Sequence, residues 1–293
     1  MKRARIHMKK EPQYLKDITY AIDSSPWIQE NNLFSSDLFL GRFSEKQIME
    51  LFDKVGILST LHKSGYKDLI INISRQEDFT SRLFVNFDSV SKDTRLIELV
   101  VKEGIFKSTQ NFIEDNDFTS GISVLMIEWL ALQNPKAQFS VERPRLPEQI
   151  YPGLGCLVNI QDMLYHFAKS GNKDAIVDVP QHYHGAVIYS RMYSFFSPID
   201  GGRFAAMVRD FKGSPLADVS FAMASGCMKD EVTGELLYWK PSEQMYPISQ
   251  KLKKYLASDG YQNLLADTAR TCRFSIDWEK YADFKRKELV DEI

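Results

Sequence analysis

Two glycines stand at the entrance of an expected helix. The stretch PGLGC occupies residues 152–156, and apolar residues at helical spacing follow it as far as Ala168. Gly153 and Gly155 can adopt backbone angles closed to other residues and leave room for a ligand to approach the amides. The first amides of a helix lack internal partners, and the helix dipole adds partial positive charge there. This combination predicts a backbone anion site suited to phosphate, the alternative being a plain turn.

A single carboxylate interrupts the apolar run GISVLMIEWLAL, residues 121–132. Strand alternation places Glu128 on the face of Val124, Met126 and Leu130. A buried carboxylate is costly to ionise, so its pKa rises unless it is paired. A raised pKa suits a base that takes a proton from an incoming ammonium. The alternative is a structural carboxylate bonded to a nearby arginine or to the backbone.

Two histidines flank Tyr183 in the segment QHYHG. Side chains two residues apart on an extended segment can ligate a metal, but no acidic or cysteine cluster accompanies His182 and His184. No metal is therefore expected. The remaining interpretations are a structural hydrogen-bonding role and, for His184, a proton carrier lining an acyl or acceptor pocket.

Three arginines, Arg143, Arg145 and Arg191, could meet phosphate groups as charge-assisted donors. Motifs of other enzyme classes are missing from the sequence. It contains no Gly-x-Ser-x-Gly elbow, Walker loop or HExxH, so nothing supports a hydrolase, an NTPase or a zincin.

These groups must be positioned by a strand-rich middle and a helical end. Alternating or β-branched runs predict strands over 68–74, 81–87, 95–101, 121–132 and 174–180. Helical spacing predicts helices that begin after Ser44, with a Ser44–Gln47 capping box, and after Gly155, and others over 200–212 and through the last 45 residues. The run LADVSFAMASGCMKDEVTGELLYWK, residues 216–240, predicts two strands around the turn 230–234, which form an expected hairpin.

The order strand, glycine turn, helix, strand places the turn at the carboxyl end of the first strand, the edge where ligands of open α/β sheets bind. The PGLG turn (152–155) and the segment GAVIYSRMYSFF (185–196) resemble the GNAT superfamily of acyl-CoA-dependent N-acyltransferases. The second segment is similar to the family's Asn-x-x-Ala-x-x-Leu-Tyr followed by Gly-Phe. In order of elements the resemblance extends over residues 68–196.

The resemblance implies an α+β fold with a GNAT-like mixed, mostly antiparallel sheet, flanked by helices and followed by a C-terminal hairpin and helical extension. Its fourth and fifth strands, 122–131 and 174–180, would separate to admit the pantetheine arm of acetyl-CoA or another acyl-CoA. The coenzyme-binding residues implied are Gly153, Leu154, Gly155, Cys156, Arg145, Leu130 and Leu132. The catalytic residues implied are Tyr189, which protonates the thiolate, with Glu128 and His184.

The expected function is transfer of an acetyl or similar group to an amine, on a small molecule or a protein, by direct attack. The sequence departs from the family pattern at Ile150, His182 and Gly185. These departures favour the alternative, a catalytically inactive GNAT-like module that binds an acyl-CoA or regulates. A mainly structural protein is the third interpretation.

Composition limits the classes of partner and the cellular compartment that are expected for the protein. The 293 residues carry a formal net charge of −2, and only MKRARIHMKK at the start is strongly basic, so no nucleic-acid partner is expected. Three widely spaced cysteines suit a reducing cytosol. No signal peptide or apolar run of membrane-spanning length is present, which predicts a cytoplasmic protein without a membrane partner.

Three regions are expected along the chain. They are a basic arm with an irregular lead-in (1–40), an acyl-CoA-binding domain (41–199) and a C-terminal α/β extension (200–293). The extension is expected to act as a lid, as a homodimer contact or as a separate small domain, and the sequence does not choose among these.

Overall fold

The computed structural model describes residues 38–75, 80–108, 112, 118 and 121–291. The predicted basic arm therefore lies outside the described residues up to position 37. Among the residues described, no helix combines the length and the apolar character needed to cross a membrane.

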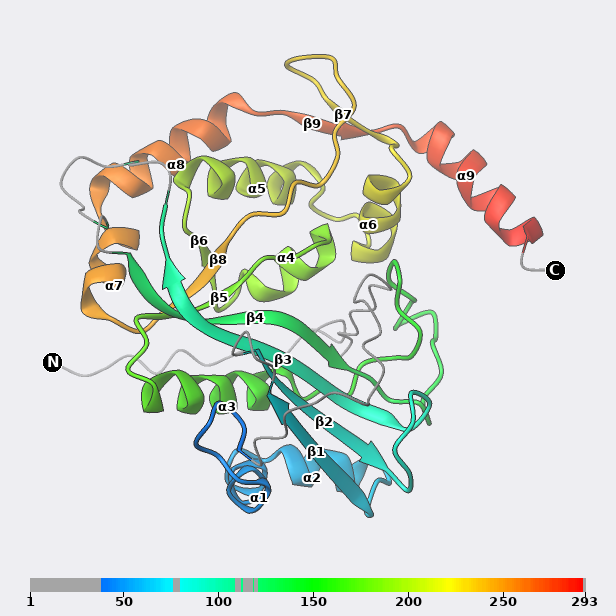
Figure 1. The fold of residues 1–293 in the computed structure, drawn as a ribbon. Coiled ribbons are helices and arrows are strands. Elements are labelled where there is room, and N and C mark those ends of the chain that lie inside the picture. Colours follow the sequence, from blue (N-terminus) through cyan, green and yellow to red (C-terminus); the bar gives the residue numbers. More distant parts are fainter. Residues whose placement is uncertain (1–37, 76–79, 109–111, 113–117, 119–120, 292–293) are drawn as a thin grey trace, which may run out of the picture.

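A seven-stranded sheet forms the centre of the described structure (Figure 1). Its strand order is β1-β2-β3-β4-β5-β8-β6, and all neighbours are antiparallel except β4 and β5, which run parallel. The strands are β1 (Leu69–Arg75), β2 (Ser81–Phe87), β3 (Arg95–Phe106), β4 (Ile122–Leu132), β5 (Ala175–Asp178), β8 (Gln244–Pro247) and β6 (Ser194–Phe195). The predicted α+β class with a mostly antiparallel sheet is confirmed.

The first helix begins where local chemistry predicts. Ser44 accepts a hydrogen bond from the Gln47 amide, and the Gln47 side chain accepts one from the Ser44 amide, so the predicted capping box is present. The helices are α1 (Glu45–Lys54), α2 (Ile57–Lys63), α3 (Leu157–Ser170), α4 (Tyr183–Tyr189), α5 (Pro198–Asp210), α6 (Leu216–Ala224), α7 (Gln250–Leu256), α8 (Asp259–Thr271) and α9 (Trp278–Asp291).

Helices lie on both sides of the sheet. In Figure 1, α1, α2 and α3 lie below it, and the C-terminal helices gather above its β5-β8-β6 half. One hydrophobic core joins α1, α2 and α3 to β1–β5, and buried Phe167 of α3 belongs to it. Two smaller cores join the second half of the chain to α4 and to β4 and β5. The sheet is thus covered most fully where β4 meets β5.

The C-terminal region takes part in the same sheet. Its strand β8 lies between β5 and β6, and the predicted boundary at residue 199 falls just inside α5. A strand predicted in the run LADVSFAMA is instead α6, because a short apolar run does not distinguish a strand from a buried helix. The turn at 230–234 does form, with Gly234 N donating to Asp230 O at 2.8 Å and Leu237 N to Met228 O at 2.9 Å. Its first strand, β7 (Met228–Asp230), then pairs with β9 (Phe274–Ile276).

Candidate functional site

Strand β5 pairs with β4 over its whole length, but β4 is the longer strand. Four residue pairs join them, from Val124–Ala175 to Ile127–Asp178. Strand β5 then ends, whereas β4 continues for five more residues, Glu128 to Leu132, still paired with β3. Five residues of strand correspond to about 16 Å. Asp178 therefore marks the point beyond which β4 has no parallel partner, called here the strand separation.

Glu128 sits at a β-bulge on this same point of β4. Val100 of β3 lies opposite Trp129 and Val101 lies opposite Ile127, so Glu128 has no opposite residue. Its side chain is exposed, which corrects the expectation of a buried carboxylate. Simple alternation failed because the bulge shifts the register. Leu130 joins the core face of Leu125 and Ile127, while Glu128 points to solvent.

The glycine turn is fastened to the far end of β4. Gly153 forms an isolated β-bridge with Gln133, and the Asn134 amide donates to the Pro152 carbonyl at 2.7 Å. Gly155 has φ +71° and is exposed, a conformation in which any other residue is strained. The turn thus lies directly beyond the carboxyl end of β4.

Helix α3 starts directly after the turn without a side-chain cap. Cys156 occupies the N-cap position and its side chain caps none of the first amides of α3. Burial raises the pKa of its thiol to about 12, so Cys156 is a neutral packing group rather than a thiolate. Leu154 is also buried, 5% exposed. The side chains of Leu154 and Cys156 are thus not open to a ligand. What the turn and the start of α3 can offer a coenzyme is their backbone amides, beside exposed Gly155.

The remaining predicted coenzyme-binding residues lie around the turn or along β4. Arg145 Nε donates to the Gln149 carbonyl at 2.7 Å and so supports the loop before the turn. Arg143 reaches the turn itself, donating to the Gly153 carbonyl at 3.3 Å. Leu130 and Leu132 lie on β4 beyond the strand separation, with side chains buried in the core.

The predicted catalytic residues of α4 are deeply buried. Tyr189 is 1% exposed, and its ring centroid lies 5.2 Å from that of Tyr193. His184 is 2% exposed, and burial together with the neighbouring His182 lowers its pKa to about 3. His184 is therefore held neutral at physiological pH and does not titrate there, contrary to the expectation of a near-neutral proton carrier.

His182 takes a different role from its neighbour. Its ring stacks on His184 at 5.2 Å, and its Nε2 lies 3.1 Å from Glu148 Oε2. This contact joins the loop before the glycine turn to the start of α4. In the described part of the chain, no cluster of three or more His, Cys, Asp or Glu residues could hold a metal ion.

The structure adds a polar cluster that the sequence analysis missed. Asp178 of β5, Gln161 of α3 and Gln244 of β8 are all at least nine-tenths buried. Asp178 and Gln244 are cross-strand partners, and Tyr193 donates to Gln161 Oε1 at 2.7 Å. One signal was available, because a lone carboxylate follows the apolar run AIV in β5.

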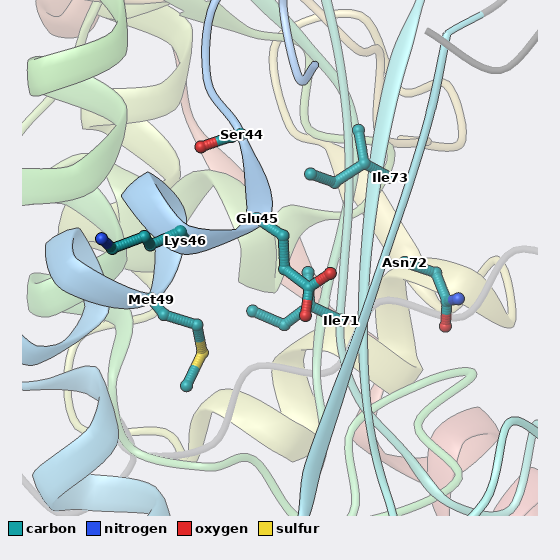
Figure 2. A pocket seen from close by; sticks show the side chains of 7 residues that line it. All are labelled: Ser44, Glu45, Lys46, Met49, Ile71, Asn72 and Ile73. Carbon is teal, nitrogen blue, oxygen red and sulfur yellow. The ribbon is translucent and has the colours of Figure 1, made fainter. Parts of the chain in front are cut away.

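A separate depression of about 610 Å³ lies at the other end of the sheet, where the start of α1 meets the edge strand β1 (Figure 2). Its lining residues are Ser44, Glu45, Lys46, Met49, Ile71, Asn72 and Ile73. None of the predicted site residues belongs to it. The candidate site therefore rests on the strand separation, the glycine turn and the buried polar cluster.

Comparison of the chain with protein-family models, with curated proteins and with solved structures finds no match.

Proposed function

We propose that this protein binds an acyl-coenzyme A along the unpaired stretch of β4 and transfers the acyl group to an amine. The observation that carries the proposal is the end of β5 beside the longer parallel strand β4, followed by a glycine turn bonded to the end of β4. The GNAT-like fold that the sequence resemblance implies would contain such an arrangement, which supports the proposal. In it the pantetheine arm takes the place of a neighbouring strand.

The anionic end of the coenzyme would lie at the glycine turn. Backbone amides from Leu154 to Cys156 and the first turn of α3 supply donors, and the helix dipole adds positive charge. Exposed Gly155 permits close approach. The Arg143 guanidinium, bonded to the carbonyl of Gly153, adds a full positive charge beside the turn. A diphosphate matches this combination of donors.

The chemistry would then take place where β4 and β5 separate. A neutral amine attacks the thioester carbonyl, so a base must first remove a proton from the ammonium. Two carboxylates stand at this point, Glu128 on the bulge of β4 and Asp178 at the end of β5. Tyr189 is the donor proposed for the departing thiolate.

Calorimetric titration with acetyl-CoA tests this function, with a matched pair of glycine variants. Gly155→Ala places a methyl group at the anion site, whereas Gly65→Ala imposes the same backbone penalty at φ +84°, where a Cβ meets nothing within 4 Å. We expect the wild type and Gly65→Ala to bind, and Gly155→Ala to lose about tenfold in affinity, which is about 1.4 kcal/mol. No heat of binding to the wild type at millimolar acetyl-CoA overturns the proposal.

A binding module without turnover is the second candidate, and the deep burial of Tyr189 and His184 favours it. Tyr189→Phe separates the two functions. If Tyr189 is the acid, turnover of a panel of primary amines falls while acetyl-CoA affinity is retained. If neither form turns over any amine while both bind acetyl-CoA, the protein is a binding module.

A further inference from the structure

The polar cluster at the end of β5 lies between three elements of the fold. Asp178 points to the same side of the sheet as Ile176, which belongs to the core shared with α3. Gln244 is paired with Asp178 across β5 and β8. Gln161 projects from the buried face of α3, and Tyr193 OH donates to its Oε1 at 2.7 Å. The cluster therefore occupies the layer between the sheet and α3.

Three buried polar atoms of this cluster have no hydrogen-bond partner in the described structure. They are the acceptors Asp178 Oδ2 and Gln244 Oε1 and the donor Gln161 Nε2. The orientation of the Gln244 amide is set by its other end, because Gln244 Nε2 donates to the Ala186 carbonyl at 3.2 Å, and a carbonyl can only accept. Gln161 Oε1 accepts from Tyr193. Buried polar atoms are nearly always paired, so three together indicate a place for a polar ligand group.

The charge around Asp178 points to a cation. Burial raises its pKa to about 7, and the Val179 amide offsets this only in part. Among the described residues, the titratable groups around the cluster are Tyr193, Tyr189 of α4, whose ring packs on Tyr193, and Tyr246 of β8. Asp162 and Tyr165 of α3 interact with Tyr246 but are themselves exposed. None of these groups is a cation. A positively charged ligand would therefore compensate the negative charge of the ionised Asp178 carboxylate.

We propose that Asp178 and Gln244 receive the primary ammonium of the acceptor substrate, and that Asp178 Oδ2 takes its proton. The inference rests on the proposed acyl transfer and names the base and the acceptor pocket for it. An ammonium N–H group matches each of the two free acceptor oxygens. Asp178 also forms the last β4–β5 pair, so the ammonium would sit next to a thioester placed in the adjoining separation.

The proton balance of the step is as follows. Asp178 Oδ2 forms an O–H bond as one ammonium N–H bond breaks, which leaves a neutral amine. The nitrogen lone pair forms a C–N bond to the thioester carbonyl carbon, and the C–S bond breaks. The thiolate takes a proton through Tyr189, whose ring packs on Tyr193 beside the cluster, and Tyr189 regains it from the former amine nitrogen. Asp178 releases its proton to solvent, which gives an amide, a thiol and one proton.

Thermal unfolding with n-butylammonium chloride at pH 8 tests the ammonium site independently of any acyl transfer. We expect the salt to raise the unfolding midpoint of the wild type and of Asp162→Asn by at least about 2 °C. Asp162 is the matched control because it is an exposed carboxylate of α3, next to Gln161. Asp178→Asn and Gln244→Met should show no rise. Tetramethylammonium, which has no N–H donor, should have no effect on any form.

Equal stabilisation of Asp178→Asn, equal stabilisation by tetramethylammonium, or no effect on the wild type overturns the ammonium site. Gln244→Met decides the question by the same criteria if Asp178→Asn does not fold. Acetyl-CoA binding measured by calorimetry on the same samples reports the proposed function separately. A protein that binds acetyl-CoA but not butylammonium retains the proposed function and loses this inference.

Acyl transfer to an accepted amine assigns the base. Asp178→Asn should lower kcat/KM by about 100-fold or more while acetyl-CoA affinity stays the same. It should also remove the rise in kcat/KM with pH near neutrality. Glu128→Gln is the competing assignment. If Glu128→Gln produces this loss and Asp178→Asn does not, Glu128 is the base and the inference is overturned.

Discussion

Two carboxylates stand on adjacent strands where β4 and β5 separate, and their surroundings differ sharply. Glu128 lies on the bulge of β4 with an exposed side chain, whereas Asp178 closes β5 with 9% of its surface exposed. The Glu128 side chain is open to water, whereas Asp178 is buried, with Gln244 opposite it on β8 and Tyr193 nearby. The chain thus presents one exposed carboxylate and one whose pKa is raised by burial.

The difference arises from one extra residue in β4. The bulge turns Glu128 outward, so the apolar face of β4 continues through Leu130 without a charge in it. Strand β5 is regular and has no bulge. Alternation therefore places the Asp178 side chain on the same face as Ile176, toward α3. The burial of Asp178 therefore follows from strand register.

The largest expected effect is on stability at alkaline pH, for Asp178→Asn. Its pKa, raised from 3.8 to about 7, means that the folded protein holds this proton more tightly than the unfolded chain does. Stability of the wild type therefore falls as pH rises through this window, and the full cost remains above pH 7. We expect the free energy of unfolding of Asp178→Asn to exceed that of the wild type by about 1–4 kcal/mol at pH 8. At pH 4 the two values should differ little.

Urea denaturation at both pH values measures this effect, with Glu128→Gln as the control. The exposed Glu128 side chain should change stability by less than about 0.5 kcal/mol at either pH. The contrast between the two carboxylates breaks down if the two variants give the same pH dependence.

A smaller effect is expected for the contact between Glu148 and His182. The two side chains are 48% and 21% exposed, so solvent screens their interaction. A double-mutant cycle of Glu148→Ala and His182→Ala should give a coupling free energy of about 0.2–1 kcal/mol. A coupling of several kcal/mol would mean that this contact, rather than the strand register, holds the loops on the two sides of the separation.

The smallest expected effect is the titration of His184. Since burial and His182 lower its pKa to about 3, its ring should remain neutral throughout the physiological range. Proton NMR of the His184 ring should show no titration between pH 5 and 8. A midpoint near neutrality would mean that a second buried group titrates in the same pH range as Asp178, and the pH dependence could no longer be assigned to the carboxylate alone.

Much of the fold was predictable because it depends on local patterns. The strand predicted over 81–87 is β2, and the one predicted over 121–132 is β4 within one residue. The capping box at Ser44 is present, since it needs only residues three positions apart. Helix α6 was missed because its short apolar run fits both periodicities, and contacts with distant segments decide between them.

The candidate site was predictable only where the backbone makes it. The glycine turn could be read from two residue types and from the helical pattern after them. The cluster of Asp178, Gln161 and Gln244 could not be predicted, because its members come from β5, α3 and β8, up to 83 positions apart (161 to 244). No local pattern carries information about which distant amide will face a given carboxylate.

The sequence by itself determined the α+β class, the positions of strands β1 to β5 and the glycine turn at the start of α3, because each depends on side chains a few residues apart. Tertiary structure alone decided that β8 from the C-terminal region pairs with β5, that a bulge turns Glu128 to solvent, and that Asp178 is buried. These features depend on which strand edges meet and in what register, and that is settled only when remote parts of the chain pack together.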